Sequence, residues 1–372
     1  MQIMTHELRK ILDGRRLLIV LVLSLLWYFP ARSIFLDPLR PVMVDVRHEM
    51  LLNYGNTWNE NDRGHFRQYF QERVQRFAAE LAQIPEAANL NITTFEGFRE
   101  EVETNQYLFD ILIEHPIWPL FVELQERYWL TQDLDIEREL EWMVNWRTQQ
   151  EIDRWLDTVS REEISFFPRE VYFAYSGFIS SVMPIILINI AILLAPLYLS
   201  ERKNRMMPLQ YSTKEGRNLF KKKIMASTLA ILLVTAVHLG FAYGTFLQTS
   251  IHLFLGMEVS GFWYDITFGH YLVLTAGAMV LVALIFGLLT LCLSRIVPNH
   301  ITILGVLVPI LLALMANRAF TFIVADIIST RFDESQTFNP PHLMPLSYLG
   351  IILLTTLLLT LQWKRECRLD IS

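Results

Sequence analysis

Cysteine is scarce in this 372-residue chain, which has only two. Cys292 lies inside an apolar run and Cys367 lies in the C-terminal tail, so the long polar stretch near the N-terminus has none. Disulfide bonds therefore cannot hold that stretch together. Because a domain of about 140 residues can bury enough apolar surface without disulfides, their absence leaves an extracellular location open.

Lysine is absent from residues 31–170. That stretch holds 27 Asp and Glu against 14 Arg, whereas the rest of the chain holds 11 acids against 18 bases, within a total net charge of -6. Lys and Arg accumulate in the cytoplasmic loops of membrane proteins, so this sorting of charge by segment is typical of a chain that crosses a membrane. All seven lysines lie outside the acidic stretch: Lys10, Lys203, Lys214, Lys221, Lys222, Lys223 and Lys364.

The motifs of the common catalytic sites are also missing. No GxxxxGK followed by Ser or Thr is present, so the chain has no P-loop, and any ATP hydrolysis must come from another polypeptide. No His pair has the spacing of a zinc helix, and the HEM at His48 is too short for one. No Ser sits in a GxSxG turn, and no apolar segment carries a paired acid, a Ser and His, or a metal-ligand set. The sequence therefore disfavours a metal enzyme, a hydrolase and an intramembrane enzyme.

Apolar residues, in contrast, are abundant: 52% of the chain is hydrophobic, and 24 residues are Phe. A helix needs about 20 apolar residues to cross a hydrocarbon core of about 30 Å. Six apolar segments predict an all-α polytopic membrane protein with six transmembrane helices and a large helical extracellular domain between the first and the second. Five segments lack any Asp, Glu, Lys or Arg, and a sixth is shorter: Val171–Ser200, Ile224–Met257, Ile266–Ser294, Ile296–Asn317, Ser335–Trp363 and, last, Leu17–Ala31.

The shorter segment, RRLLIVLVLSLLWYFPARS, fits two interpretations. A basic flank before a short apolar stretch occurs in secretory signal peptides as well as in membrane anchors. The preceding residues favour an anchor, because they carry an apolar stripe that suits a helix in the membrane interface and is rare in signal peptides. The stripe consists of Ile3, Met4, Leu8, Ile11 and Leu12.

Loop charges set the predicted orientation. The basic N-terminus, the basic loop between the second and third spans and the basic tail belong in the cytoplasm, which requires an even number of spans. The predicted order is a cytoplasmic interfacial helix (1–16), the first span (17–36), the extracellular acidic helical domain (37–170) and the second span (171–200). A cytoplasmic loop (201–223), spans three to six (224–363) and a cytoplasmic tail (364–372) follow.

The acidic domain is predicted to be helical. Apolar residues recur at steps of three and four from Phe66 to Ile84 within the segment 63–84, and further helices are expected near Phe95–Leu112 and Ile136–Val159. A turn-rich link is expected from Pro30 to Pro41. The domain contains six of the nine Trp, whose spacing favours a packed core over a platform that binds cationic cargo.

The loop ERKNRMMPLQYSTKEGRNLFKKK carries the most information about function. It opens with Glu201 and holds eight Lys and Arg against two Glu. Positive charge alone serves topology and contact with anionic lipid. The apolar patch of residues 206–209 between the charges is instead typical of a docking surface.

With its interfacial N-terminal helix, its large outer insertion and a Glu directly after the second span, the chain resembles the membrane subunits of bacterial type-two ABC exporters. The Tyr-Ser-Thr-Lys of residues 211–214, the Gly-Arg of residues 216–217 and the Lys-rich start of the third span are similar to a signature of that family. In such exporters this loop forms a coupling helix on a separate ATPase subunit. The resemblance implies that role here for Glu201, Arg202, Arg205, Met206, Met207, Leu209, Tyr211, Lys214 and Arg217.

The resemblance also implies partners and a location. Expected partners are an ABC ATPase, which holds ATP and Mg²⁺, a second copy of the permease or a sister permease, and membrane lipid. No cofactor is expected in this chain, and nucleic acid is not a partner. The expected location is the bacterial cell membrane, with both termini cytoplasmic. The cargo class is open between an amphipathic or antimicrobial peptide and a lipid-like compound.

Two further features bear on transport. Asn317 and Arg318 lie roughly 26 Å along the fifth span from its start, which places them near the outer boundary, where they are candidates for an exit path. The intramembrane His238 is interpreted as a packed, hydrogen-bonded residue and not as a proton carrier. The principal alternative to an exporter is a membrane-anchored receptor or scaffold whose extracellular domain binds a partner.

Overall fold

The structure is a computed structural model, and it describes most of the chain. The described residues are 2–36, 41–55, 57–58, 60–105, 110, 112–133, 164–165, 167–203, 216–249, 251–257, 266–297, 299–316 and scattered positions between 349 and 364. They fall into two compact units, each of which is described by itself. The bundle unit comprises residues 1–38, 169–255 and 261–372, and the insert unit comprises residues 39–168 and 256–260.

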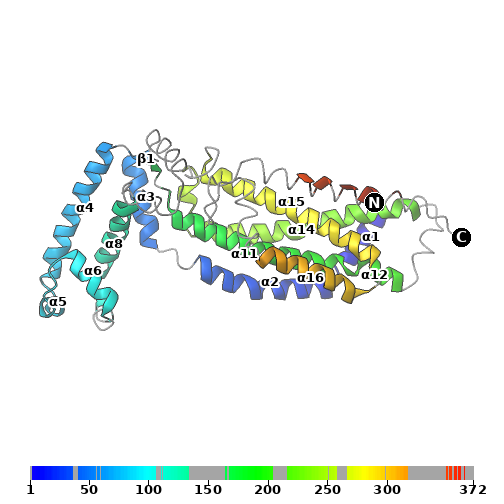
Figure 1. The fold of residues 1–372 in the computed structure, drawn as a ribbon, viewed down its shortest axis with the longest axis horizontal. Helices are drawn as coiled ribbons and strands as arrows, with labels where there is room; N and C mark the ends of the chain where they lie inside the picture. The colour runs from blue at the N-terminus through cyan, green and yellow to red at the C-terminus, as the bar shows by residue number, and fades with distance from the viewer. Residues whose placement is uncertain are drawn as a thin grey trace, which may run out of the picture. The chain divides into compact units, whose positions relative to one another are not determined.

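Long apolar helices form the bundle unit (Figure 1). Among the described residues, four stretches are long and apolar enough to cross a membrane: Gly14–Phe35, Ala174–Glu201, Leu219–Leu247 and Phe268–Ile296. Helices α2 (Gly14–Phe35) and α15 (Phe268–Ile296) coincide with two of them. The second stretch comprises most of α11 (Arg169–Leu194) and of α12 (Pro196–Lys203), and the third lies in α14 (Gly216–Leu247). A single 3₁₀ turn, η1 (Ile251–Phe254), follows α14.

These helices confirm a membrane-compatible helical protein with four candidate spans, and the fifth and sixth spans stay predictions. The helix at the fifth position, α16 (His300–Ala316), has 17 residues, which corresponds to roughly 26 Å of helix. In the sixth segment, residues 335–348 lie outside the described part of the chain.

Helix α2 packs into the bundle along α11, and its Tyr28 also contacts His238 and Phe241 of α14. The indole nitrogen of Trp27 donates to the Ser181 carbonyl (2.6 Å), and the Tyr28 hydroxyl donates to the His238 carbonyl (3.0 Å). One of these partners is in the buried His238 and the other is in the half-buried Ser181. Retention of the first span as an anchor stays a prediction. The helix also continues through Pro30 to Phe35, so the expected turn-rich link is shorter than predicted. Membrane helices tolerate proline, although it lacks the backbone N–H that would donate a hydrogen bond.

The N-terminal helix α1 (Gln2–Ile11) is amphipathic as predicted, but α14 lies against it. Ile11 at the end of its apolar stripe is fully buried, and Leu8 is half-buried. The stripe therefore contacts protein and is not wholly available to the membrane interface.

The described residues of the insert unit are helical, as predicted, apart from one pair of two-residue strands. Helix α4 (Glu60–Leu81) matches the helix expected over residues 63–84, and α6 (Phe95–Thr104) ends earlier than the expected Leu112. The short α5 (Pro85–Asn89) lies between them. Helices α3 (Pro41–Tyr54) and α8 (Trp118–Asp133) had not been predicted. Strands β1 (Thr57–Trp58) and β2 (Ile164–Ser165) pair antiparallel, and the helix expected near Ile136–Val159 lies outside the described residues.

Phenylalanine rings make the core of the insert unit. Phe77 of α4 meets the ring of Phe98 of α6 at 5.3 Å between centroids, and Phe98 meets Phe121 of α8 at 4.9 Å, both edge to face. Thr94 begins α6 as an N-cap, since its hydroxyl accepts from the Gly97 amide at 3.1 Å. The spacing of three and four in α4 thus fills a core, as the pattern predicted.

Candidate functional site

The loop after the second span begins beside a buried carboxylate. Helix α11 ends at Leu194, and Pro196 begins the eight-residue α12 at a position where its missing N–H is not needed. This short helix carries Glu201 to within two residues of the last described residue before the loop, Lys203. The Glu201 side chain is only 3% exposed.

Glu201 binds two lysines from other helices. Its Oε2 accepts from the Lys223 amine of α14, and its Oε1 lies 3.3 Å from the Lys10 amine of α1. Lys10 also donates to Glu7 Oε1 at 2.9 Å, one turn away in α1. We call Glu7, Lys10, Glu201 and Lys223 the charge cluster. Two carboxylates and two amines balance within it, so three separate segments are tied together without excess charge.

Aromatic rings border the charge cluster. The Lys223 amine lies 4.9 Å from the centroid of the Tyr198 ring, and the Arg295 guanidinium of α15 lies 5.3 Å from the same ring. Arg295 is also 5.6 Å from the Phe220 ring. A cation over an aromatic face is attracted by its quadrupole, more strongly when water is excluded. The rings therefore extend the cluster to a fourth helix, α15.

Arg16 forms a hydrogen bond at the C-terminal end of α11, just before α12 begins. Its guanidinium donates to the Leu193 carbonyl (3.4 Å) and to the Lys10 carbonyl (3.3 Å). Helix ends leave carbonyl groups without an intrahelical donor, and Arg16 supplies donors to one such group at the end of α1 and to one at the end of α11. The start of α2 is thereby joined to the segment that leads to Glu201.

Charges in the cluster stabilise the protonated form of Lys10. Burial by itself lowers the pKa of this amine, but the hydrogen bond to Glu7 and the negative charges of Glu7 and Glu201 outweigh burial and raise its pKa above 10.5. Lys10 is therefore charged at neutral pH. Within the described residues, Glu7 Oε2 is buried and has no hydrogen-bond partner, so the cluster retains one unused acceptor.

The charge cluster fixes how three helices pack together. Breaking a buried ion pair by removing one partner is strongly destabilising, because the other charge stays buried. The cluster therefore favours one arrangement of α1, α12 and α14 at the point where the loop leaves the bundle. Among the described residues, no group of three or more His, Cys, Asp or Glu is placed to hold a metal ion.

The residues that the resemblance assigned to ATPase contact fall into three groups. Glu201 lies inside the bundle, and its contact with another subunit stays a prediction. Arg202 lies in α12 and Arg217 lies in the first turn of α14. The remaining loop residues and both exit-path residues lie outside the described part of the chain: Arg205, Met206, Met207, Leu209, Tyr211, Lys214, Asn317 and Arg318.

Sequence reasoning missed Glu7, Lys10 and Lys223 as site residues. Glu7 and Lys10 lie outside the predicted apolar stripe, and their spacing of three is that of an ion pair on a helix. Lys223 had been treated as one of three equivalent lysines. Neither signal identifies Glu201 as the partner, which lies 191 residues from Lys10 in the chain.

The insert unit contains a second polar site, a cleft between α3, α4 and α8 with a volume of about 280 Å³. In its wall the Tyr54 hydroxyl and His65 Nδ1 lie 2.6 Å apart. Burial and the nearby Asp62 raise the pKa of Tyr54. The floor contains Arg127, whose guanidinium is 2% exposed and pairs with Glu49 and, at 3.0 Å, with Glu123.

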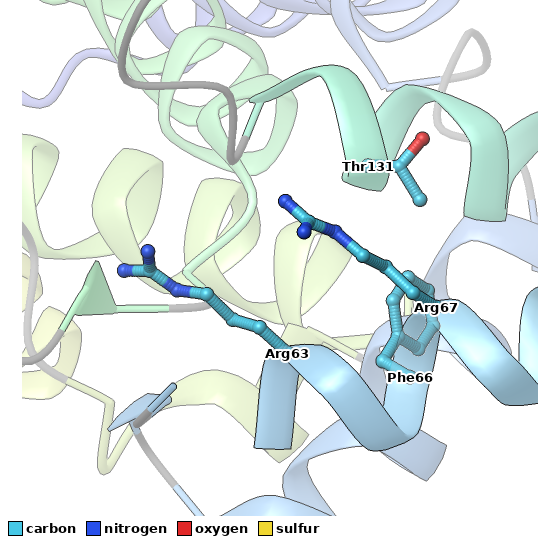
Figure 2. Close-up of a pocket in the computed structure, with 4 residues that line it drawn as sticks. All are labelled: Arg63, Phe66, Arg67 and Thr131. Carbon is cyan, nitrogen blue, oxygen red and sulfur yellow. The ribbon is translucent and has the colours of Figure 1, made fainter. Parts of the chain in front are cut away.

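A smaller cavity of about 10 Å³ lies nearby, with room for about one water molecule. Figure 2 shows Arg63, Phe66 and Arg67 of α4 and Thr131 of α8 around it. The Thr131 hydroxyl donates to the Tyr128 carbonyl at 2.7 Å. This cavity is too small for an organic ligand.

Known proteins do not identify this chain. No protein-family model matches it, and neither the curated proteins nor the solved structures contain a match.

Proposed function

We propose that this protein is the membrane subunit of an ATP-driven exporter of the type-two ABC class, in the bacterial cell membrane with both termini in the cytoplasm. It acts with a separate ATPase subunit, which holds ATP and Mg²⁺, and with a second copy of itself or a sister permease. Its six spans form the path for an amphipathic peptide or a lipid-like compound. The observation that carries the proposal is the charge cluster at the ends of the 204–215 loop.

The ion pair between Glu201 and Lys223 supports a coupling role for that loop. The helix before the loop carries Glu201 and the helix after it carries Lys223, so one buried contact joins the two helices that flank the loop. A force applied to a loop between two independent helices is absorbed by bending of the loop. Helices that are joined move together when the loop is pushed, as a coupling element requires.

Lys10 adds the N-terminal helix to the same element. Its amine contacts Glu201, while Arg16 contacts the end of α11. In the proposed mechanism, ATP-driven closure of the ATPase subunits pushes the 204–215 loop, and α1, α12 and α14 move as one body. The spans that continue from α12 and α14 then change access from the inner to the outer side.

The deciding experiment is capture of the ATPase. The tagged chain is purified from its native membrane in mild detergent, and co-purifying proteins with a P-loop are identified by mass spectrometry. Deletion of Met206 to Leu209 is expected to abolish capture, and deletion of residues 369–372 in the tail is the matched control. Capture and transport that survive loss of the loop patch would overturn the assignment of the loop.

The cleft of the insert unit supports a second candidate function, that of a receptor or scaffold that binds a partner outside the membrane. A cleft of about 280 Å³ lined by Tyr54, His65 and Tyr69 can admit a side chain or a small ligand. Labelling of the chain's membrane neighbourhood separates the two functions, because an exporter requires an ATPase neighbour and a receptor does not.

A further inference from the structure

Three polar side chains meet in the interior of the bundle unit, one from each of three helices. Ser24 of α2, Asn189 of α11 and His238 of α14 are 8%, 0% and 5% exposed. Each lies well inside a stretch that is apolar enough to cross a membrane. An ionisable residue such as His is rare in such a stretch and is a candidate for a functional site.

Hydrogen bonds determine the state of the His238 ring. Its Nδ1 lies 2.7 Å from the Val234 carbonyl, which can only accept, so Nδ1 carries a proton. In the neutral ring Nε2 is then an acceptor. The Asn189 amide nitrogen is 2.9 Å from Nε2 and donates to it, which confirms the interpretation of His238 as packed and hydrogen-bonded.

The other two side chains complete the network. The Asn189 amide nitrogen also donates to Ser24 Oγ at 2.9 Å, and Ser24 donates to the Val20 carbonyl at 2.7 Å. Ser24 Oγ lies 3.0 Å from His238 Nε2. Asn189 Oδ1 is buried and, among the described residues, has no hydrogen-bond partner. One acceptor oxygen is thus present next to the imidazole and unused.

The surroundings of the ring contain no competing charge within the described residues. From α2, Tyr28 is the titratable group that faces the imidazole, with 6.1 Å between ring centroids. From α11 the neutral Asn189 faces it, and from α14 the Val234 carbonyl. Lys223 is the nearest lysine along α14, at 15 residues or roughly 22 Å of helix. The stability of a protonated His238 ring would therefore depend on Ser24 and Asn189.

We propose that His238 is a proton-binding site inside the bundle, which keeps the packed, hydrogen-bonded ring of the sequence interpretation but departs from its view that the residue is not a proton carrier. A proton from water binds at Nε2, and no other bond is formed or broken. After protonation, Nε2 donates a hydrogen bond and needs an acceptor beside it, whereas in the neutral ring Nε2 accepts and needs a donor. A half-turn of the Asn189 amide puts Oδ1 in place of the nitrogen, and Ser24 Oγ accepts as well while it still donates to Val20.

An amide can supply a donor or an acceptor at nearly the same position, because its oxygen and nitrogen are nearly the same size and exchange places in a half-turn. Asn189 and Ser24 are therefore positioning residues for the proton. The half-turn changes the hydrogen bonds that join α2, α11 and α14, so the packing of the first span responds to pH. This inference goes beyond the proposed transport function, because it needs no ATPase.

The test is a titration of the imidazole. The full chain with ¹⁵N-labelled histidine is placed in lipid nanodiscs, and the ring nitrogen shifts are followed from pH 4.5 to 8.5. The His238 signals are assigned by their loss in His238→Gln. At high pH the ring is expected to be the neutral Nδ1–H tautomer, and it is expected to take up a proton reversibly as the pH falls.

Variants separate a proton site from a packed residue. Asn189→Leu is expected to lower the proton affinity of His238 at least tenfold, and Ser24→Ala at least threefold. Tyr28→Phe removes a hydroxyl that contacts the His238 carbonyl and not its ring, so it is expected to leave the titration unchanged. If Asn189→Leu does not fold, the titration of Ser24→Ala alone separates a proton-binding site from a packed residue.

Two results would overturn the proposal. One is a wild-type His238 that stays neutral throughout the pH range while the protein remains folded. The other is a titration in which the folded variants at Asn189 and Ser24 match the wild type. Failure to capture an ATPase would leave this test unaffected, so the two proposals can fail separately.

Discussion

Replacement of Glu201 by Gln tests how much the charge cluster stabilises the bundle. The substitution keeps the size and shape of the side chain and removes its charge. Lys223, which is 3% exposed, then keeps a buried ammonium without its carboxylate, whereas Lys10 retains Glu7. Loss of one partner of a buried ion pair costs about 3–5 kcal/mol in soluble proteins.

The membrane lowers the expected value. Polar contacts between membrane helices average about 0.6 kcal/mol, because the unfolded state in the membrane also finds partners for polar groups. The ion pair joins helices near a bundle end and involves full charges, so we expect a loss of about 3 kcal/mol for Glu201→Gln, at the lower end of the range for buried pairs.

A double-mutant cycle isolates the pair. Lys223→Met removes the ammonium and leaves Glu201 with Lys10, so it is expected to cost less than Glu201→Gln. The double variant contains neither charge, and it is expected to recover about 2 kcal/mol relative to the sum of the single variants, because removal of both partners of a buried pair is often nearly neutral. The free energy of unfolding is measured by denaturation with SDS in mixed micelles.

Lys222→Met is the matched control, since it removes a neighbouring lysine that lies outside the charge cluster. A loss below 1 kcal/mol for Glu201→Gln, together with a coupling energy near zero, would refute the reasoning that the pair joins α12 to α14.

Three other predictions concern packing and pH. A Cβ on Gly287 of α15 would lie 2.8 Å from Ile231 Cγ1, so Gly287→Ala is expected to destabilise the bundle by about 1–3 kcal/mol, whereas Gly277→Ala on the same helix meets nothing within 4 Å and is expected to be neutral, both by denaturation with SDS. Phe77→Ala empties a fully buried site and is expected to cost about 3–5 kcal/mol, read as the cooperative loss of helicity by circular dichroism; a loss below 1 kcal/mol would contradict the assigned core. Because the pKa of Lys10 is raised in the folded protein, its contribution is present below pH 10.5 and is lost as the pH rises above that value; exchange of α1 amides that does not accelerate there would argue against the pairing.

Membrane character could be predicted from the sequence because the bilayer acts on composition. Long uncharged apolar runs satisfy the length and hydropathy of a span whatever their neighbours, so four of the six predicted spans were found in the described residues. The spacing of Phe66, Phe70 and Phe77 likewise predicted the buried face of α4. The limits of helices were predicted less well: α2 continues past Pro30, and α6 ends before Leu112.

The candidate site could be predicted only in part. Glu201 was selected from its place directly after the second span, but its partners could not be, since they lie 22 and 191 residues away in the chain. The same holds for Ser24, Asn189 and His238, which are separated by 165 and 49 residues. Hydropathy and periodicity are local properties, and they contain no information on which polar groups of different helices will meet.

The sequence alone determined that the chain places long apolar helices in a membrane-like environment and keeps its lysines away from the acidic insert, because solvent sorts residues by type. Only the tertiary structure decided that Glu201 is buried against Lys223 and that His238 lies between Ser24 and Asn189. A buried polar group is stable only where the packing of helices brings it a partner, and that packing is a property of the whole bundle.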